Sequence, residues 1–148
     1  MTKLKVYLDN CCYNRPFDDL AQARIKREAE AVKLVLSLSK QGVLLIVASI
    51  FTDIEMNQTK NDWKYRKVLE LYRYDEYYRQ NENIENTAKR FQTYGLKPFD
   101  SLHLAVAETN HVDYLLTTDD GFIATTRQFE HITKIMNPYN FINEEKYR

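Results

Sequence analysis

The chain has 148 residues, of which 44% are hydrophobic and 28% charged, and this composition excludes a disordered or fibrous protein. A chain of this length fits one domain, residues 1–148, with enough buried surface to fold without disulfides or metals. Its 21 basic and 21 acidic residues balance, so nucleic acid would have to bind a local patch rather than the whole surface.

The sequence also lacks an apolar run of the roughly 18 residues that a membrane-spanning helix needs. Its charged start, MTKLK, leads into a strand pattern instead of the apolar core of a signal peptide. The only cysteines, Cys11 and Cys12, are adjacent, which suits neither an ordinary disulfide nor a four-ligand zinc site. We therefore expect a cytoplasmic protein.

The N-terminal half alternates between strand and helix patterns. A short apolar and β-branched run, LKVYLD, predicts a strand with Asp9 at its carboxyl end. Across residues 20–41 apolar side chains recur at three- and four-residue steps, which predicts an amphipathic helix that ends at Gly42. The nearly continuous apolar run GVLLIVA is typical of a strand buried on both faces of a parallel sheet. Ser49 can then cap a helix over SIFTDIEMNQT.

The C-terminal half begins with two helix patterns, over residues 61–79 and 81–94. The first pattern places four side chains on one helix face, namely Val68, Leu71, Tyr72 and Tyr78. Gly95 and Pro98 break the chain before a short helix over FDSLHLAVAETN. In that helix Asp100 takes an N-terminal position, which favours an acidic side chain.

The remaining residues repeat the alternation. We expect a strand over VDYLLTT, a last helix around GFIATTRQF and a last strand over ITKIM, and we expect Pro138 to begin a tail. Strands that alternate with helices in this way form a parallel sheet covered by helices. The sequence therefore predicts an α/β fold in a single domain.

Four acidic residues lie near the ends of these elements, where sites form in open parallel sheets. Asp9 and Asp119 come directly after the first and third predicted strands. Glu55 lies six residues after Ser49, about two turns into the helix that leaves the second strand. Asp100 begins the helix that leads to the third strand. We therefore expect the four carboxylates to converge at one edge of the sheet.

Four carboxylates at one edge would repel each other, by about 3 kcal/mol per pair at ~5 Å and an effective dielectric constant of ~20. Protonation, basic partners or a divalent cation would relieve this repulsion, and a cation is the better account. Oxygen ligands favour Mg²⁺ or Mn²⁺ over zinc, which prefers His and Cys. Such a cation ionises a bound water and offsets charge on a phosphodiester, so the cluster suits hydrolysis with one or two metals.

Four stretches resemble, in order, the acidic motifs of PIN-domain proteins, namely YLDNCCYNRPFDD, SIFTDIE, KPFDSLHLAVAE and LLTTDDGF. On this resemblance Asp9 is similar to the first-strand aspartate and Glu55 to the helical glutamate. Asp100 is similar to the aspartate of the D-x-x-H-L-A-x-A helix, and Asp119 to that of T-x-D-x-x-F. The resemblance implies a PIN-like three-layer α/β/α domain and a metal-dependent ribonuclease. Many bacterial PIN domains are VapC-like toxins held inactive by a small antitoxin protein, so the resemblance also implies an antitoxin as a candidate partner.

The chain departs from the family pattern beside its first aspartate. Many PIN domains follow this aspartate with a Thr or Ser hydroxyl, whereas this chain has Asn10, whose amide can also hydrogen-bond there. At the last motif Asp120 follows Asp119 directly, so Asp120 could take over its role if the turn differs.

Each site residue also has a structural interpretation. Asp9 and Asp119 can be turn residues, Asp100 a helix cap and Glu55 a solvated helix residue. Only their convergence favours a functional role. His103 lies one turn beyond Asp100 in an apolar helix, and we interpret it as a hydrogen-bonded core histidine rather than as a ligand or base.

The N-terminal motif contains a cysteine and an arginine that could belong to other chemistry. Arg15 either binds a phosphate of the substrate or pairs with Asp18 or Asp19. Cys12 and Arg15 are only three residues apart with no glycine between them, which is too short for a phosphatase loop. We therefore expect the cysteines to be packing residues.

A basic and aromatic stretch, KNDWKYRKVLELYRYDEYYRQ, has two interpretations. Lys64, Arg66 and Lys67 alternate with aromatic side chains, a combination that suits single-stranded RNA. Tyrosine-rich faces are equally typical of protein interfaces, and here they would hold a second copy of the chain or an antitoxin. Acidic residues interrupt the basic run, among them Glu70 and Asp75, which slightly favours the interface.

Two functions from different classes are compatible with these residues. The first is a Mg²⁺- or Mn²⁺-dependent endoribonuclease, in which Asp9, Asp100 and Asp119 bind the metal and Glu55 completes its shell or orients the water. The alternative is a non-catalytic PIN-like module that binds RNA or a protein and has a regulatory role.

Overall fold

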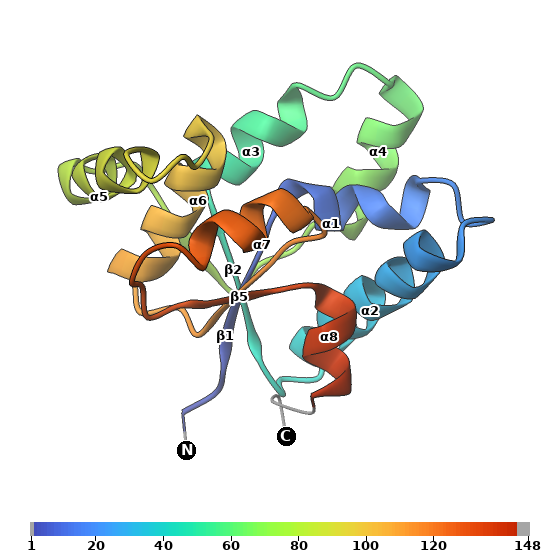
Figure 1. Cartoon of the computed structure of the whole chain (residues 1–148). Coiled ribbons are helices and arrows are strands. Elements are labelled where there is room, and N and C mark those ends of the chain that lie inside the picture. Colours follow the sequence, from blue (N-terminus) through green and yellow to red (C-terminus); the bar gives the residue numbers. More distant parts are fainter. Residues whose placement is uncertain (1, 145–148) are drawn as a thin grey trace.

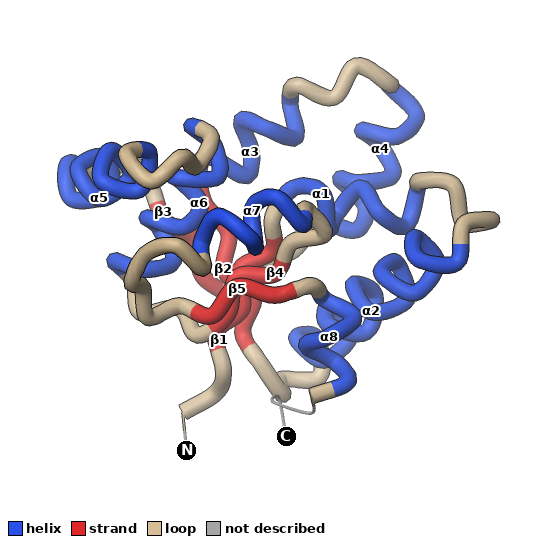
Figure 2. Tube along the Cα trace, in the orientation of Figure 1, coloured by secondary structure: helices blue, strands red, loops and turns tan. Residues whose placement is uncertain are grey.

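The computed structural model describes residues 2–144, which form a five-stranded parallel sheet with helices on both faces (Figures 1 and 2). The strands are β1 (Lys5–Leu8), β2 (Leu45–Ser49), β3 (Glu76–Tyr78), β4 (Tyr114–Leu116) and β5 (Lys134–Met136). They lie in the order β3-β2-β1-β4-β5, and Val6 of β1 pairs with Ile46 on one side and Tyr114 on the other. β1 is therefore the centre of the sheet.

Eight α-helices are found among the described residues. They are α1 (Asn10–Asn14), α2 (Ala23–Lys40), α3 (Ile50–Asn57), α4 (Asp62–Leu71), α5 (Glu82–Gln92), α6 (Pro98–Thr109), α7 (Asp120–Thr126) and α8 (Pro138–Asn143), with a 3₁₀ turn η1 at Arg15–Phe17. Figure 1 shows α5 and α6 on one side of the sheet and α2 and α8 on the other. The predicted α/β fold, with a central parallel sheet in an α/β/α arrangement, is confirmed.

The two faces of the sheet bury separate hydrophobic cores, because successive side chains of a strand point to opposite faces. Val6 and Leu8 belong to the core beneath α2 and α8, whereas Tyr7 belongs to the core beneath α5 and α6. α3 crosses the end of the sheet and contributes Met56 to the first core and Phe51 to the second. The same alternation explains the continuous apolar run of β2, which is buried on both faces as predicted.

Local signals for helix ends act as expected. Gly42 ends α2 with a φ of +77°, and the amides of Gly42 and Val43 donate to the carbonyls of Ser39 and Leu38, an arrangement that satisfies the last turn. Ser49 caps α3, because its hydroxyl accepts a hydrogen bond from the amide of Phe51 at 3.2 Å.

No helix among residues 2–144 is long and apolar enough to cross a membrane.

The predicted helix over residues 61–79 is wrong in its second half. α4 ends at Leu71, and Tyr78 lies in β3 instead of on a helix face. The reason is Asp75, whose carboxylate accepts hydrogen bonds from the Ile46 amide (2.8 Å) and the Ser39 hydroxyl (2.6 Å), while its own amide donates to the Ile46 carbonyl. These contacts align the segment with β2, so pairing in the sheet overrides the helical periodicity.

The predicted tail after Pro138 is also wrong, because these residues form α8. Pro138 occupies the first turn, where its missing amide costs nothing, and Asn137 caps the helix by accepting from the Tyr139 amide at 2.8 Å. Phe141 is fully buried and packs edge-on against Tyr114, with ring centroids 5.0 Å apart. Burial of this ring holds α8 against the sheet.

Candidate active site

An acidic cleft of about 800 Å³ opens at the carboxyl edge of the sheet, next to the ends of β1 and β4. Its lining includes Asp9, Glu55, Asp100 and Asp119. The other lining residues are Asn10, Cys11, Asn14, Asp18, Thr59, Lys64, Lys97, Pro98 and Phe99. The connections on the two sides of β1 lie on opposite faces of the sheet, and ligand sites form at such points in open parallel sheets. The structure thus places all four predicted acids in one cleft.

Asp9 caps a helix and also lines the cleft. Its Oδ1 accepts from the Asn10 amide at 2.8 Å and so caps α1, while its Oδ2 accepts from the Thr117 hydroxyl at 2.8 Å. Only 6% of the residue is exposed, and this burial raises the pKa of its carboxyl group above the ordinary range. The cap fixes the side chain at the floor of the cleft, which leaves it available for a ligand.

Asp100 is half-buried in the first turn of α6, but it is not the cap, because Lys97 occupies that position. Its carboxylate has no hydrogen-bond partner among residues 2–144. Burial, together with the negative charges of Asp9 and Asp119, raises the pKa of Asp100 to about 7. This carboxylate therefore lies where negative charge is unfavourable in the absence of a cation.

Asp119 lies at the end of the loop that follows β4, and its side chain caps α7. Its Oδ1 accepts from the amides of Gly121 and Phe122 at 2.9 and 3.2 Å. The neighbouring Asp120 points elsewhere and forms two hydrogen bonds of 2.8 Å with the guanidinium of Arg24. Asp119 rather than Asp120 therefore lines the acidic cleft.

Glu55 meets His103, which is fully buried on α6. His103 Nε2 contacts Glu55 Oε1 and lies 3.8 Å from Asp9 Oδ1, and its Nδ1 lies 2.5 Å from the Tyr7 hydroxyl. Burial lowers the pKa of His103, but the hydrogen bond to Glu55 and the charge of Asp9 outweigh it, and the net pKa is raised. The Tyr7 hydroxyl is in turn 2.7 Å from the Ser49 hydroxyl, which ties the start of α3 to this chain of contacts.

His103 is thus a neighbour of the candidate site that sequence reasoning set aside. It is a buried, hydrogen-bonded histidine, as interpreted, but its partners are residues of the candidate site. The spacing D-x-x-H was the available signal, because residues three apart on a helix share a face. A second omitted residue is Lys97, which lines the cleft and forms no ion pair with any residue of the described range.

The cleft brings together donor atoms of the kinds that bind metal ions. One ligand atom each of Asp9, Glu55 and His103 lies within 4.8 Å of the others. The His103 nitrogen already contacts Glu55, so the carboxylate oxygens are the donors left for a cation. Asp100 and Asp119 line the same cleft but do not belong to that group. The Oδ1 of Asn10 is buried with no hydrogen-bond partner in the described structure, and such an atom needs a water or an ion. Carboxylate and amide oxygens suit Mg²⁺ or Mn²⁺.

Only one of the four predicted substrate-binding residues lines the cleft. Lys64 lines the cleft and pairs with Asp18 at 2.5 Å. Arg15, the other predicted phosphate contact, lies outside it and pairs with Glu28 at 2.8 Å and Asp18 at 3.1 Å, so of its two alternatives the pairing with Asp18 is the one present. Arg66 and Lys67 are surface residues of α4 outside the cleft, and they form ion pairs with Asp62 and Glu70 respectively.

The cysteines differ from each other. Cys12 is fully buried in the core, as predicted, and its thiol donates to the Leu116 carbonyl at 3.3 Å. Cys11 lines the cleft, and its sulfur lies 3.4 Å from Asp9 Oδ2 and from the Thr117 hydroxyl.

Asp100→Asn should raise the melting temperature of the protein in chelator, and the gain should grow between pH 4 and 7. In the unfolded chain Asp100 ionises near its ordinary pKa of 3.8, but in the folded protein it ionises only near 7. Stability is therefore lost as the pH rises through this window, and the gain from Asn levels off above it. Melts from pH 3 to 8 measure the effect, with Asp62→Asn on the exposed face of α4 as control. A difference in melting temperature that does not change with pH would contradict the raised pKa of Asp100.

Comparison with known proteins gives structural matches only. No protein-family profile matches the chain, and no curated protein matches it in sequence. A structure of FitAcB from Neisseria gonorrhoeae matches with a TM-score of 0.58 and 16% identity, covering 90% of this chain and 98% of that chain. A structure of VapBC2 from Rickettsia felis, bound to a DNA fragment from their promoter, matches with a TM-score of 0.63 and 11% identity, with the same coverage. This chain therefore has the fold of the PIN-domain proteins.

Proposed function

We propose that this chain is a divalent-metal-dependent endoribonuclease that hydrolyses phosphodiester bonds of RNA. The observation that supports the proposal is the meeting of Asp9, Glu55, Asp100 and Asp119 in one cleft at the carboxyl edge of a parallel sheet. Separate structural roles would not require residues so distant in sequence to share a cleft. The PIN-like fold agrees with this chemistry, which the sequence motifs imply independently.

The chain's own residues would position the reaction. Asp9, Glu55, Asp100 and Asp119 would hold one or two Mg²⁺ or Mn²⁺ ions, which when bound ionise water and offset charge on a phosphodiester. His103 and Tyr7 fix the orientation of Glu55, and the cap of α1 fixes Asp9.

The rim of the cleft supplies the groups that would contact RNA. Lys97, which has no ion-pair partner among the described residues, provides positive charge near the acids, and Lys64 would have to exchange its contact with Asp18 for a phosphate. Phe99 lines the cleft as well and offers a ring on which a base can stack.

We further propose that the enzyme works in the cytoplasm with protein partners, either as a homodimer or with a small antitoxin. Aromatic side chains beside the edge strand β3 suit such an interface. The rings of Tyr72, Tyr74 and Tyr77 follow one another at centroid distances of 5.6 and 5.1 Å. The hydroxyls of Tyr72 and Tyr77 both donate to Asp53, at 2.8 and 2.5 Å, which holds the rings in place. Rigid aromatic groups of this kind are typical anchors of protein interfaces.

The proposed function predicts that Mg²⁺ or Mn²⁺ at millimolar concentration binds in calorimetry and raises the melting temperature. The cation should stabilise the folded state by mass action and by relieving repulsion among the carboxylates, whereas Na⁺ at matched ionic strength only screens. Cleavage of unstructured and structured RNA should occur with the metal and stop with a chelator.

Absence of divalent binding would contradict the metal site. Tight RNA binding without cleavage under any divalent condition would favour the alternative, a non-catalytic binding module.

A further inference from the structure

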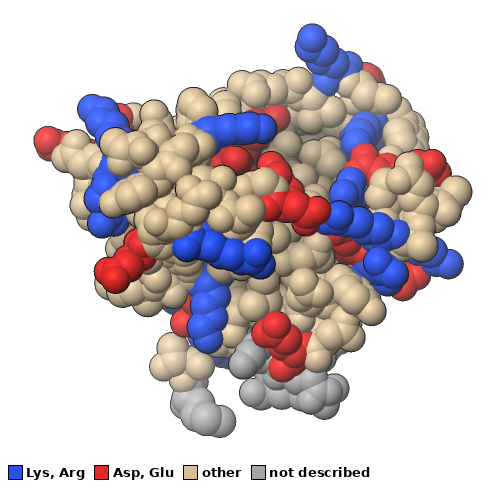
Figure 3. All heavy atoms as spheres, viewed as in Figure 1, with Lys and Arg blue, Asp and Glu red and all other residues tan. Residues whose placement is uncertain are grey.

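A second cavity, of about 700 Å³, lies next to the acidic cleft and differs from it in charge. Three arginines line it, Arg24 and Arg27 from α2 and Arg127 from the end of α7, and we call it the arginine cavity. The start of α7 lies between the two cavities, because Asp119 lines the acidic cleft and Asp120 lines the arginine cavity. Figure 3 shows Lys and Arg side chains beside Asp and Glu side chains on the face of the molecule that it draws.

Most of the charges beneath the arginine cavity neutralise one another. Glu28 is only 2% exposed, and its carboxylate accepts hydrogen bonds from Arg15, Arg24 and Asn137. Arg24 also pairs with Asp120. These groups hold α2 against α7 and α8 and leave no spare charge for a ligand.

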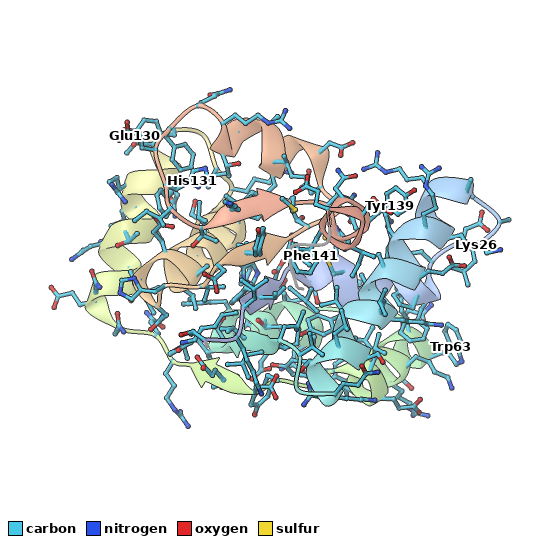
Figure 4. The ribbon with its side chains drawn as sticks, turned by 90° about the horizontal axis from the view of Figure 1, so that it is seen from below. Lys26, Trp63, Glu130, His131, Tyr139 and Phe141 are labelled. Carbon is cyan, nitrogen blue, oxygen red and sulfur yellow. The ribbon has the colours of Figure 1, made fainter. Side chains whose placement is uncertain are left out.

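Arg27 and Arg127 are different, because neither forms an ion pair within residues 2–144. The guanidinium of Arg27 lies over the ring of Tyr139, 5.2 Å from its centroid, and Figure 4 shows Tyr139 between α8 and α2. Tyr139 is 40% exposed, and Asn140 beside it also lines the cavity. Glu144 is the only other acidic residue in the lining besides Glu28 and Asp120.

We propose that the arginine cavity binds the backbone of single-stranded RNA next to the bond that is cut, an inference that rests on the proposed function. Guanidinium groups bind phosphate oxygens through paired hydrogen bonds, which suits Arg27 and Arg127. The ring of Tyr139 offers a stacking surface for a base, and the side-chain amide of Asn140 can form a hydrogen bond with the edge of a base. A strand that crosses the Asp119–Asp120 turn would have one phosphate at the acids and neighbouring phosphates at the arginines.

The test is the affinity of labelled single-stranded oligonucleotides, measured by fluorescence anisotropy in chelator so that no cleavage occurs. The double variant Arg27→Gln/Arg127→Gln should bind a 12-nucleotide RNA at least tenfold more weakly. Its dependence on salt should also flatten, by about 1.4 in the slope of log K against log salt for two lost phosphate contacts. Tyr139→Ala should weaken binding without changing this slope, because stacking releases no counterions.

The matched control is Arg79→Gln/Arg90→Gln, which removes two exposed arginines outside both cavities. Calorimetric metal affinity and cleavage of a dinucleotide should be unchanged in the Arg27/Arg127 variant. Equal weakening in the control, or no weakening in the variant, would overturn the inference. A polyglutamate peptide serves as a second probe. If the Arg27/Arg127 variant loses affinity for this peptide but keeps its affinity for RNA, the cavity binds an acidic protein, and the inference is also overturned. RNA affinity that depends on Arg27 and Arg127, in a protein that binds no metal and cuts no RNA, would contradict the proposed function. It would still support the arginine cavity as an RNA-binding site.

Discussion

Asp9→Asn should reduce RNA cleavage by at least about 100-fold, equivalent to ~2.7 kcal/mol of activation free energy, while the protein stays folded. Asn is as good a helix cap as Asp, so α1 should keep its N-terminus. The substitution removes one negative charge from the group formed by Asp9, Glu55 and His103, and calorimetry should show weaker binding of Mn²⁺. Single-turnover cleavage and thermal melts together measure the effect.

The control for Asp9 is Asp62→Asn, an acid on the surface of α4 outside the acidic cleft. It should cleave RNA at the rate of the unmodified protein. Full cleavage by Asp9→Asn would show that Asp9 is only the cap of α1. A loss of cleavage that follows a loss of folding would show that the contacts to Asn10 and Thr117 are structural.

Glu28→Ala should lower the free energy of unfolding by about 1–3 kcal/mol, because it leaves the buried Asn137 amide and the partly buried Arg15 guanidinium without one acceptor each. Glu28 accepts from Arg15 at 2.8 Å, from Arg24 at 3.1 Å and from Asn137. It therefore connects η1, α2 and the residue that caps α8. Urea unfolding followed by circular dichroism measures the change.

Glu30→Ala is the matched control, since Glu30 lies on the exposed face of the same helix. Substitutions at such surface positions change stability by about 0.5 kcal/mol or less. An equal effect of the two substitutions would show that the contacts of Glu28 contribute nothing net to folding.

Much of the fold could be predicted because its signals are local. The apolar run of β2 indicated burial on both faces, and the periodicity of α2 with Gly42 at its end indicated a helix. The placement of Asp9 and Asp119 in one cleft followed from a general rule, since both come after neighbouring parallel strands.

The parts that were missed depend on contacts between distant residues. β3 pairs with β2 through Asp75, and its sequence alone continues the helical pattern of α4. His103 binds Tyr7, which is 96 residues away, and Glu55, which is 48 residues away. No window of sequence contains such pairs, so neither the orientation of Glu55 nor the raised pKa of His103 could be inferred before the fold was known.

The central position of β1 has a consequence for synthesis of the chain. Domains emerge from the ribosome N-terminus first, so Asp9 and Glu55 are made well before Asp100 and Asp119. β1 can pair with β2 early, but its other neighbour, β4, begins only at Tyr114. A nascent chain therefore has no complete acidic cleft until most of its length has been translated. A ribonuclease with this topology would be unable to cut the RNA around its own ribosome during most of its synthesis.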